Sequence, residues 1–398
     1  MKGISMQPES GIARNDFLRM AVAIVGSAVA QAGWNPARAA VQQQISKTPA
    51  DRFANRVLSD TATTMLSLGA YIGDRLGIYQ TMADAGPATV SVLASKARLS
   101  ERYLQEWLAL MTTAGYIRYE PRSSKYWLPR EHATVLCDQN SPLYMGGFVE
   151  LLACIFPINK VIEGFRGGKG PLAEDYLPEH WEGIEKSTAP IYRNFLTQSY
   201  IPAMPDIVAR LRKGGAALDL GCGGGLASIA IAQAYPNAEV FGLDVFAPSI
   251  DKARKNAEAA KIGGRAHFDT YDGHTLPVER FDLVTIFYAL HHLTDPVEVL
   301  VSAGNALRKG GSLVIMEANI PEKLEGSVNH TYANWNYGVS LFYCMSEVLT
   351  EGGPGYGAAI KGSKIRELGD KAGFKTCRRL PVQSPFDALY EFKATGAI

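Results

Sequence analysis

A short apolar run that ends in a cluster of glycines constrains this chain more than any other feature. Residues 216–225 read Ala-Ala-Leu-Asp-Leu-Gly-Cys-Gly-Gly-Gly, and small and apolar residues follow at 226–234. A strand that stops at glycines just before a helix is how α/β folds build a ligand site at the carboxyl end of a sheet. Because glycine has no Cβ atom, a ligand can approach the backbone closely there. The stretch therefore predicts an α/β domain with a ligand at this loop.

The glycine loop departs from the two commonest nucleotide-binding patterns. Gly221 and Gly223 match the dinucleotide fingerprint, but Leu226 stands where that fingerprint has its last glycine. No Gly-Lys-Ser/Thr sequence follows to complete a phosphate-binding loop. The loop thus argues against NAD and ATP, and a nicotinamide oxidoreductase is an alternative that Leu226 disfavours.

Two acidic residues accompany the glycine loop. Asp219 lies inside the motif, and Asp244 ends the next predicted strand, at residues 239–244. Asp244 lies 23 positions after Gly221. That separation is near the spacing at which a carboxylate accepts both hydroxyls of a ribose. The two acids therefore predict a nucleoside-containing ligand that is held at both ends.

These motifs resemble those of the class I S-adenosylmethionine-dependent methyltransferases. Residues 272–277 look like the family's loop after its third strand, 281–293 like its fourth strand, and 307–317 like its turn and fifth strand. The resemblance implies a Rossmann-like α/β domain, with a mostly parallel seven-stranded sheet and a terminal antiparallel hairpin, and S-adenosyl-L-methionine as the cofactor. The cofactor-binding residues that it implies are Tyr192, Asp219, Gly221, Gly223, Asp244, Val245, Asp272, Gly273 and Phe287, with Asp272 at the adenine.

Alternating patterns predict the order of the elements around the loop. Expected strands are 216–220, 239–244, 265–269, 281–287, 312–318, 374–382 and 388–396, and expected helices are 225–235, 248–260, 296–308 and 363–372. Strands and helices that alternate in this way indicate a parallel sheet with helices on both faces. Residues 319–362 break the alternation and carry many aromatic side chains, so we expect them to close over the methyl acceptor.

The amino-terminal part predicts a different domain. Apolar residues at helical spacing from Thr61, a second helical stretch at 90–95 and a helix at 100–115 precede two alternating segments, 116–119 and 125–128. Three helices and a hairpin form a winged helix, which suggests DNA. The expected recognition helix 100–115, however, balances its basic residue with acidic neighbours, so it would hold phosphates poorly. Its apolar face instead predicts packing against a second subunit, in a homodimer.

The segment between the two domains completes a second resemblance. Together with Gly73-Asp-Arg-Leu-Gly77, its aromatic residues resemble the bacterial winged-helix methyltransferases of the type first defined in a mycobacterial protein of unknown substrate. The likeness covers residues 51 to about 321. With it, the chain is expected to comprise a helical arm at 1–50, a winged-helix dimerisation domain at 51–140, a helical linker and cofactor lid at 141–205, and a SAM-binding domain at 206–398 with its lid insertion at 319–362. Tyr192 then becomes a candidate lid residue, or alternatively an ordinary half-buried aromatic residue.

Candidate catalytic residues follow the fourth strand. Methyl transfer needs alignment first, and a hydroxyl or thiol acceptor also needs a base, which is worth about a hundred- to ten-thousand-fold in rate. Residues 290–293, Leu-His-His-Leu, resemble the Leu-His-Asp-Trp segment of small-molecule O-methyltransferases, in which the first histidine is the base. We therefore expect His291 to be the base. His292 is the neighbouring candidate, and we expect the two side chains to point in different directions. Glu317 and His330 are further candidates for the base. In the alternative interpretation, His291 and His292 only shape the part of the site that holds the methionine end of the cofactor.

Composition limits the compartment and the partners. Lysine and arginine number 40 against 39 acidic residues, a formal net charge of +1, so no basic excess attracts nucleic acid or an acidic membrane surface. The five cysteines are scattered without a Cys-x-x-Cys pair, so we expect no metal and no disulfide framework. An apolar run at 20–30 after Arg19 imitates an export signal, but a helical arm is the simpler interpretation. No run reaches the ~18 apolar residues of a membrane span.

The sequence as a whole predicts a cytoplasmic methyltransferase. Its acceptor would be a small molecule that offers an O, S or N nucleophile in an aromatic-lined pocket, with neither nucleic acid nor membrane as a partner. A SAM-responsive winged-helix transcriptional regulator is the alternative from another class. The residues do not identify the acceptor.

Overall fold

The structure is a computed structural model that describes residues 48–271 and 274–394. The chain divides into two compact units, Met1–Met65 and Leu66–Ile398. In the first unit the described residues begin at 48, and helix α3 (Pro49–Arg75) starts there. Of the helical arm predicted at 1–50, all but the last three residues lie outside the described part. Within the described ranges, no helix is both long enough and apolar enough to cross a bilayer.

A three-helix domain with a hairpin begins the second unit. Its elements are α4 (Ile78–Ala85), α5 (Val90–Ala97), α6 (Glu101–Thr113), β1 (Arg118–Glu120) and β2 (Lys125–Trp127), followed by α7 (Arg130–Leu136). Leu104, Leu108 and Met111 recur at helical spacing on α6 and pack into the core of this domain. The prediction that this apolar face packs against a second subunit was therefore wrong. Trp107 on the same helix donates its indole N–H to the Gly69 carbonyl of α3 at 2.7 Å. The predicted winged helix is confirmed, although its first helix is α4 and the helix predicted from Thr61 is part of α3.

A seven-stranded sheet with the order β5-β4-β3-β6-β7-β9-β8 forms the rest of the second unit. Its strands are β3 (Ala216–Leu220), β4 (Glu239–Asp244), β5 (Ala266–Thr270), β6 (Phe281–Phe287), β7 (Leu307–Ala318), β8 (Cys377–Arg379) and β9 (Asp387–Lys393). Strands β3 to β7 pair in parallel, whereas β9 runs antiparallel to both β7 and β8. The predicted fold, a mostly parallel sheet with a terminal antiparallel hairpin, is confirmed.

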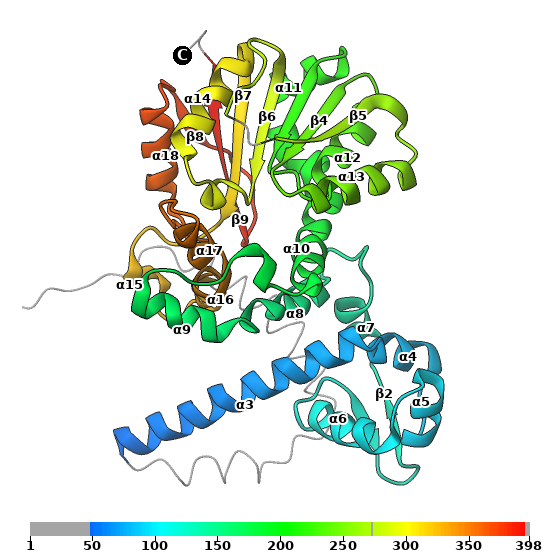
Figure 1. The fold of residues 1–398 in the computed structure, drawn as a ribbon. Helices are drawn as coiled ribbons and strands as arrows, with labels where there is room; N and C mark the ends of the chain where they lie inside the picture. Colours follow the sequence, from blue (N-terminus) through cyan, green and yellow to red (C-terminus); the bar gives the residue numbers. More distant parts are fainter. Residues whose placement is uncertain (1–47, 272–273, 395–398) are drawn as a thin grey trace, which may run out of the picture. The chain divides into compact units, whose positions relative to one another are not determined.

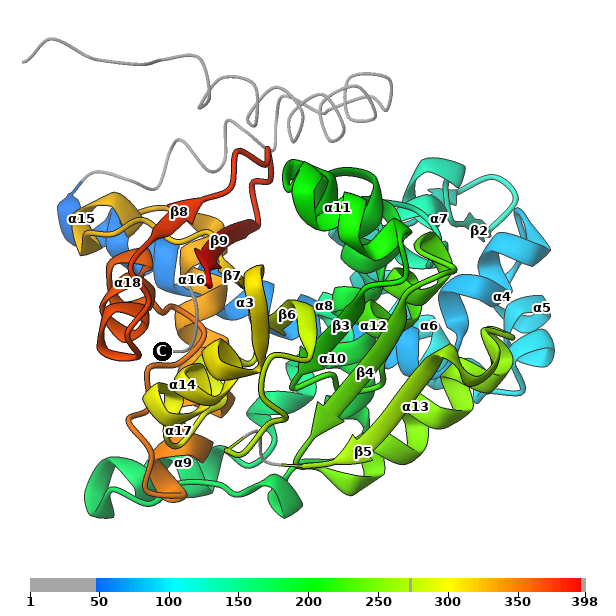
Figure 2. The same ribbon diagram turned by 90° about the horizontal axis from the view of Figure 1, so that it is seen from above.

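Helices cover both faces of this sheet (Figures 1 and 2). One face carries α11 (Pro205–Arg212), α12 (Leu226–Ala234) and α13 (Ala247–Ala259), and the other carries α14 (Pro296–Ala306) and α18 (Gly362–Lys371). Alternate residues of β3 explain this arrangement. Ala217 packs into the core beneath α12 and α13, whereas Leu218 and Leu220 pack into the core beneath α14 and α18. Strands that are apolar on both sides need cover on both faces.

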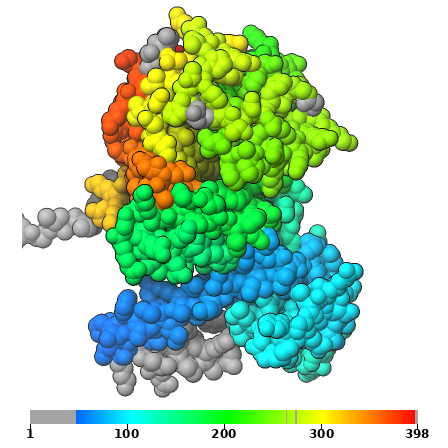
Figure 3. Space-filling view, in the orientation of Figure 1, coloured from blue at the N-terminus to red at the C-terminus, as the bar shows by residue number. Residues whose placement is uncertain are grey.

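Two helical segments gather at one end of the sheet, the lower end in Figure 1. The first comprises α8 (Gly146–Glu150), η1 (Leu151–Ile155), α9 (Ile158–Gly167), η2 (Ala173–Asp175), α10 (Pro178–Ile191), the π-helix η3 (Tyr192–Tyr200) and η4 (Ile201–Ala203). The second comprises α15 (Leu324–Ser327), α16 (Thr331–Val339), the π-helix η7 (Ser340–Cys344) and α17 (Met345–Thr350). The Tyr176 hydroxyl donates to the Phe342 carbonyl at 2.9 Å, so the two segments are in contact. Figure 3 shows the green surface of the first segment against the orange surface of the second.

Predicted boundaries were wrong by two residues or more in β7, α14, β8 and β9. Strand β7 begins at Leu307 rather than 312, because the chain bulges where Gly310 takes a positive φ of 75° and the register with β6 shifts. Helix α14 consequently ends at Ala306 rather than 308. Strand β8 covers Cys377–Arg379 rather than 374–382, and Pro381 has no N–H with which to extend the ladder. Strand β9 ends at Lys393, and the final residues of its predicted range lie outside the described part.

Candidate active site

The glycine loop has a backbone that requires glycine. Gly221, Gly223 and Gly225 have φ angles of 71°, 52° and 76°, in the left-handed region that other residues rarely adopt. A Cβ atom on Gly221 would lie 2.5 Å from the Cβ of Ala289, so the loop packs closely on the chain that follows β6. A Cβ atom on Gly223 would meet nothing within 4 Å. The loop is therefore tight on one side and open at Gly223.

Asp244 lies directly beside this open position. Its carboxylate accepts the backbone N–H of Gly223 at 2.9 Å and that of Phe246 at 2.9 Å. Burial raises the pKa of Asp244, and the two backbone hydrogen bonds oppose that rise. The structure thus brings together the glycine loop and the acid that the sequence places 23 residues later. The neighbouring Val245 is 70% exposed.

Asp219, the acid inside the motif, is engaged within the protein. Its two carboxylate oxygens accept the Ser228 hydroxyl and the Thr285 hydroxyl, each at 2.8 Å. Burial raises the pKa of Asp219 to about 6. These bonds join β3 to α12 and to β6, so the carboxylate braces the loop from behind. Asp272 and Gly273, the two predicted adenine-loop residues, lie outside the described residues.

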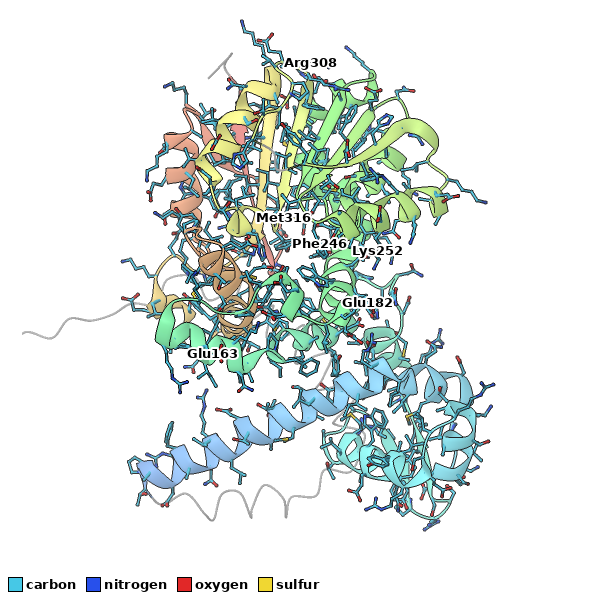
Figure 4. All side chains as sticks on the ribbon, in the orientation of Figure 1. Glu163, Glu182, Phe246, Lys252, Arg308 and Met316 are labelled. Carbon is cyan, nitrogen blue, oxygen red and sulfur yellow. The ribbon has the colours of Figure 1, made fainter. Side chains whose placement is uncertain are left out.

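Helix α10 lies over the glycine loop. Its Trp181 ring packs on Phe246, with ring centroids 5.0 Å apart. Glu185 forms an ion pair with Lys252 of α13 at 2.5 Å, and one of its carboxylate oxygens would lie 2.9 Å from a Cβ atom on Gly224. Figure 4 labels Phe246 and Lys252 at the end of the sheet where α10 lies. This helix is therefore in position to cover whatever the loop binds.

Tyr192 continues the same cover directly after α10. It begins the π-helix η3, and its ring stacks on Phe287 with centroids 6.1 Å apart. Both residues are buried, at the end of β6. Sequence reasoning missed Glu185, although Trp181, Glu185 and Tyr192 lie at spacings of four and seven residues, which place them on one face of a helix. That spacing was the available signal.

The two histidines lie in the short helix η6 (Leu290–His292) after β6, and each has its own glutamate. His291 Nδ1 donates to Glu317 Oε2 at 2.6 Å, and its backbone N–H donates to Glu317 Oε1 at 3.3 Å. His292 Nδ1 lies 3.4 Å from a carboxylate oxygen of Glu347. His291 and Glu317 are both buried. Since a carboxylate at Nδ1 fixes the proton there, the Nε2 atom of His291 is left as an acceptor.

The expectation that the two histidine side chains point in different directions was wrong. Their ring centroids lie 4.5 Å apart, with 41° between the ring planes. Burial and the neighbouring His291 lower the pKa of His292. His330, the reserve candidate, has a structural task, because its Nδ1 accepts the Ala333 N–H at 3.2 Å and so caps α16.

An aromatic wall connects the histidines to the cover over Asp244. We use this name for Tyr176, His180, Trp181 and Tyr343. The Tyr343 ring lies 4.9 Å from His292 and 5.9 Å from Trp181, measured between centroids. Because Trp181 also packs on Phe246, the wall extends from the acid beside the glycine loop to the histidine pair.

One group of side chains in the described part of the chain has the geometry of a metal site. His291, His292 and Cys344 each offer a ligand atom, and these atoms lie within 4.8 Å of one another. The sequence predicted no metal, because the cysteines are scattered and Cys344 lies 52 positions after His292, outside any metal-ligand spacing pattern. Burial raises the pKa of the Cys344 thiol well above its ordinary value, which opposes the thiolate that a metal needs.

Comparison with known families identifies the class. A methyltransferase-domain family matches residues 211–372, and a family described as the Rv2258c-like winged HTH domain matches residues 64–138. With the strand order and the glycine loop, these matches identify a class I, SAM-dependent methyltransferase domain at residues 211–372. More particularly, the chain combines a winged-helix domain of the Rv2258c-like type with this methyltransferase domain. Both predicted resemblances are confirmed.

The curated relatives named here match less than half of the chain. The ubiquinone biosynthesis O-methyltransferase of Coxiella burnetii is 26% identical over 163 residues, 41% of this chain and 64% of that protein. An uncharacterised 37.1 kDa transposon protein of Streptomyces fradiae is 35% identical over 192 residues, 48% of this chain and 51% of that protein. The chain thus spans less than two thirds of these relatives.

Solved structures share the fold over most of the chain. Mitomycin 7-O-methyltransferase is 18% identical, with a TM-score of 0.65, over 87% of this chain and 100% of that chain. Human N-acetylserotonin methyltransferase, solved in complex with SAM, is 18% identical, with a TM-score of 0.62, over 88% of this chain and 99% of that chain. At this identity the likeness is one of fold.

Proposed function

We propose that this protein transfers a methyl group from S-adenosylmethionine to a small-molecule acceptor held beneath α10 and the insertion 319–362. The observation that carries the proposal is the buried His291–Glu317 pair, at the same sheet end as the glycine loop and Asp244. The acceptor atom is O, S or N, and the O-methyltransferase names of several relatives favour oxygen. The aromatic wall supplies the apolar lining of the proposed pocket.

The residues at the glycine loop fit the cofactor. Space around Gly223 would admit a ligand against the backbone, and Asp244 could accept the ribose hydroxyls with the lone pairs that its two backbone bonds leave free. We assign Tyr192, Val245 and Phe287 to contacts along the cofactor. Asp219 would act through the loop that it braces, and the adenine contact of Asp272 and Gly273 stays a prediction.

The chemistry divides between alignment and proton removal. Bound S-adenosylmethionine supplies a methyl group on a positively charged sulfur. Helix α10 and the aromatic wall would exclude water and hold the acceptor in line, the larger contribution. The Nε2 atom of His291 would take the acceptor's proton, and the Glu317 carboxylate at Nδ1 would stabilise the imidazolium that results. His292, with Glu347, remains the neighbouring candidate.

The cofactor assignment is tested at Asp244. Asp244→Asn keeps the shape of the side chain but loses charge-assisted hydrogen bonds of about 1.5–3 kcal/mol each. We therefore expect S-adenosylhomocysteine to bind at least about tenfold more weakly, by calorimetry. Asp251→Asn is the control, since Asp251 is exposed on α13. Unchanged affinity in Asp244→Asn would remove this residue from the cofactor site. Transfer of labelled methyl to a panel of small acceptors tests the activity itself.

A SAM-responsive DNA-binding regulator is the second candidate, and the winged-helix match motivates it. On α6, however, Arg102 forms an ion pair with Glu106 at 2.5 Å. A cation paired within its own helix is poorly available to phosphates, so we favour the enzyme. Protection of an operator that depends on SAM would favour the regulator instead.

We also propose a homodimer in the cytoplasm. Its cysteines are free, and S-adenosylmethionine is a cytosolic metabolite. On α3, Phe53, Leu58 and Met65 are exposed, as expected of an interface. Light scattering at micromolar concentration should give twice the chain mass, and Leu58→Asp should give a monomer. Leu324→Asp is the matched control, because Leu324 has the same exposure of 68%. A wild-type monomer would contradict the proposal.

A further inference from the structure

His180 is a buried polar residue without an internal partner. It lies on α10 with no exposed surface, and neither of its ring nitrogens has a hydrogen-bond partner among the described residues. Burial lowers the pKa of His180 to about 3, so the ring is neutral at physiological pH. A neutral imidazole carries one donor and one acceptor, and leaving either unpaired inside a protein costs stability. The requirements of folding do not explain this residue.

Three other histidines of the chain have hydrogen-bond partners within the protein. His132 Nδ1 lies 2.7 Å from the Tyr116 carbonyl, and His330 caps α16. His291 is bonded to Glu317. Each of these rings thus gains a hydrogen bond from folding. His180 differs in having two polar atoms that fit a partner from outside the chain.

The surroundings of His180 define what that partner would be. Its ring stacks on Tyr176 with centroids 4.7 Å apart and packs against Tyr343 at 4.2 Å and Trp181 at 5.0 Å. Three aromatic rings favour a planar, apolar body. The neutral imidazole offers no charge, and the two glutamates at the histidine pair would repel an anion. An uncharged aromatic molecule with a hydroxyl or carbonyl group meets both conditions.

The position of His180 favours the acceptor over the cofactor as this partner. Tyr343 packs against both His180 and His292, so a single ring separates His180 from the histidine pair that contains the proposed base. The cofactor has its own proposed partners at the glycine loop and Asp244. A molecule whose reacting atom faces His291 could therefore place a remote polar group at His180.

We propose that His180 is a specificity-determining residue, which hydrogen-bonds an uncharged hydroxyl or carbonyl group on an aromatic methyl acceptor. The acceptor approaches when α10 and η7 separate, because His180 is enclosed between them. This inference rests on the proposed function and adds the substrate class. It also implies that His180 weakens the folded state in return for recognition.

The test uses two probes that differ in one remote hydroxyl, 2,7-dihydroxynaphthalene and 2-naphthol. With S-adenosylhomocysteine present, calorimetry on the wild-type protein should show about tenfold tighter binding of the diol, the worth of one hydrogen bond. His180→Phe keeps the ring but removes both nitrogens. It should bind the two probes equally, bind S-adenosylhomocysteine as the wild type does, and melt higher by about 2–4 °C.

Further variants separate recognition from folding. His180→Leu covers the case in which the larger phenylalanine strains the core, and it should show the same loss of preference. His180→Gln retains a donor and an acceptor and should restore part of the preference. His132→Phe, the control, breaks an existing hydrogen bond, so it should lower the melting temperature and keep the preference for the diol.

Three outcomes would overturn the proposal. Lower melting temperatures for both His180→Phe and His180→Leu, with the preference intact, would make His180 a structural residue. Weaker binding of S-adenosylhomocysteine by His180→Phe and His180→Leu would assign His180 to the cofactor site. Wild-type protein that binds S-adenosylhomocysteine but neither naphthol would reject the aromatic acceptor class. Failure to bind S-adenosylhomocysteine at all would instead contradict the proposed function.

Discussion

Replacing His291 by alanine should lower turnover by about a hundredfold or more, with almost no change in the affinity for S-adenosylmethionine. The reason is geometric. The 2.6 Å bond from Nδ1 to Glu317 fixes the ring, so the variant removes a base that is already oriented. Cofactor binding depends instead on the glycine loop and Asp244. Single-turnover kinetics and calorimetry with S-adenosylhomocysteine measure the two effects separately.

The loss should also depend on the acidity of the acceptor. A thiol with a pKa near 8.5 ionises more readily than a phenol near 10, and an acceptor that is already ionised needs no base. His291→Ala should therefore methylate a thiol almost normally and fail on a phenol of similar shape. His292→Ala, which leaves the His291–Glu317 pair intact, is the control and should lose less. The reverse order would make His292 the base.

Equal losses on both acceptors would indicate that His291 only shapes the pocket. So would a defect confined to cofactor binding. Metal dependence provides a separate check, because His291, His292 and Cys344 lie within ligand distance of one another. If dialysis against a chelator abolished activity and zinc restored it, these residues would act as ligands, and the role of a free base at His291 would be rejected.

The parts of the fold that depend on sequence neighbours could be predicted. Strands β3 and β6 have the predicted bounds, because each is an apolar run with a clear end. Once β6 was placed, His291 had to lie at the carboxyl end of the sheet, near the glycine loop. The pairing of Asp244 with Gly223 followed from the same topology, since Asp244 ends β4 and Gly223 follows β3, its parallel neighbour.

The contacts between distant segments could not be predicted in this way. Glu347 meets His292 from an insertion more than fifty residues later, and nothing in its local sequence distinguishes it from a surface acid. Glu185 meets Lys252 for the same reason, across α10 and α13. The unpartnered burial of His180 could not be predicted either, because burial without a hydrogen-bond partner is a property of the packed molecule.

Backbone irregularities near the site were also hidden. Pro190 lies in α10 without an N–H to donate, and the helix then widens into the π-helix that carries Tyr192. A propensity argument recognises the proline, but it does not say whether the chain will bend, stop or widen. Packing of Tyr192 on Phe287 stabilises the outcome that is observed.

Gly223→Val should abolish detectable binding of S-adenosylhomocysteine, a loss of at least about a hundredfold in affinity. Two effects combine at this position. A β-branched residue is strained at the φ of 52°, which disturbs the N–H that Gly223 donates to Asp244. The valine side chain would also project into the open space beside the loop, where the cofactor is proposed to bind.

Gly115→Val separates these two effects. Gly115 has a φ of 80° and likewise open space around its Cβ position, but it lies in the turn between α6 and β1, away from the loop. Both variants should therefore melt at lower temperature by similar amounts, since each strains the backbone. Only Gly223→Val should lose the binding of S-adenosylhomocysteine. The affinity of Gly223→Ala should lie between those of the wild type and Gly223→Val. If Gly223→Val bound S-adenosylhomocysteine as well as Gly115→Val did, the space beside Gly223 would not be the cofactor site.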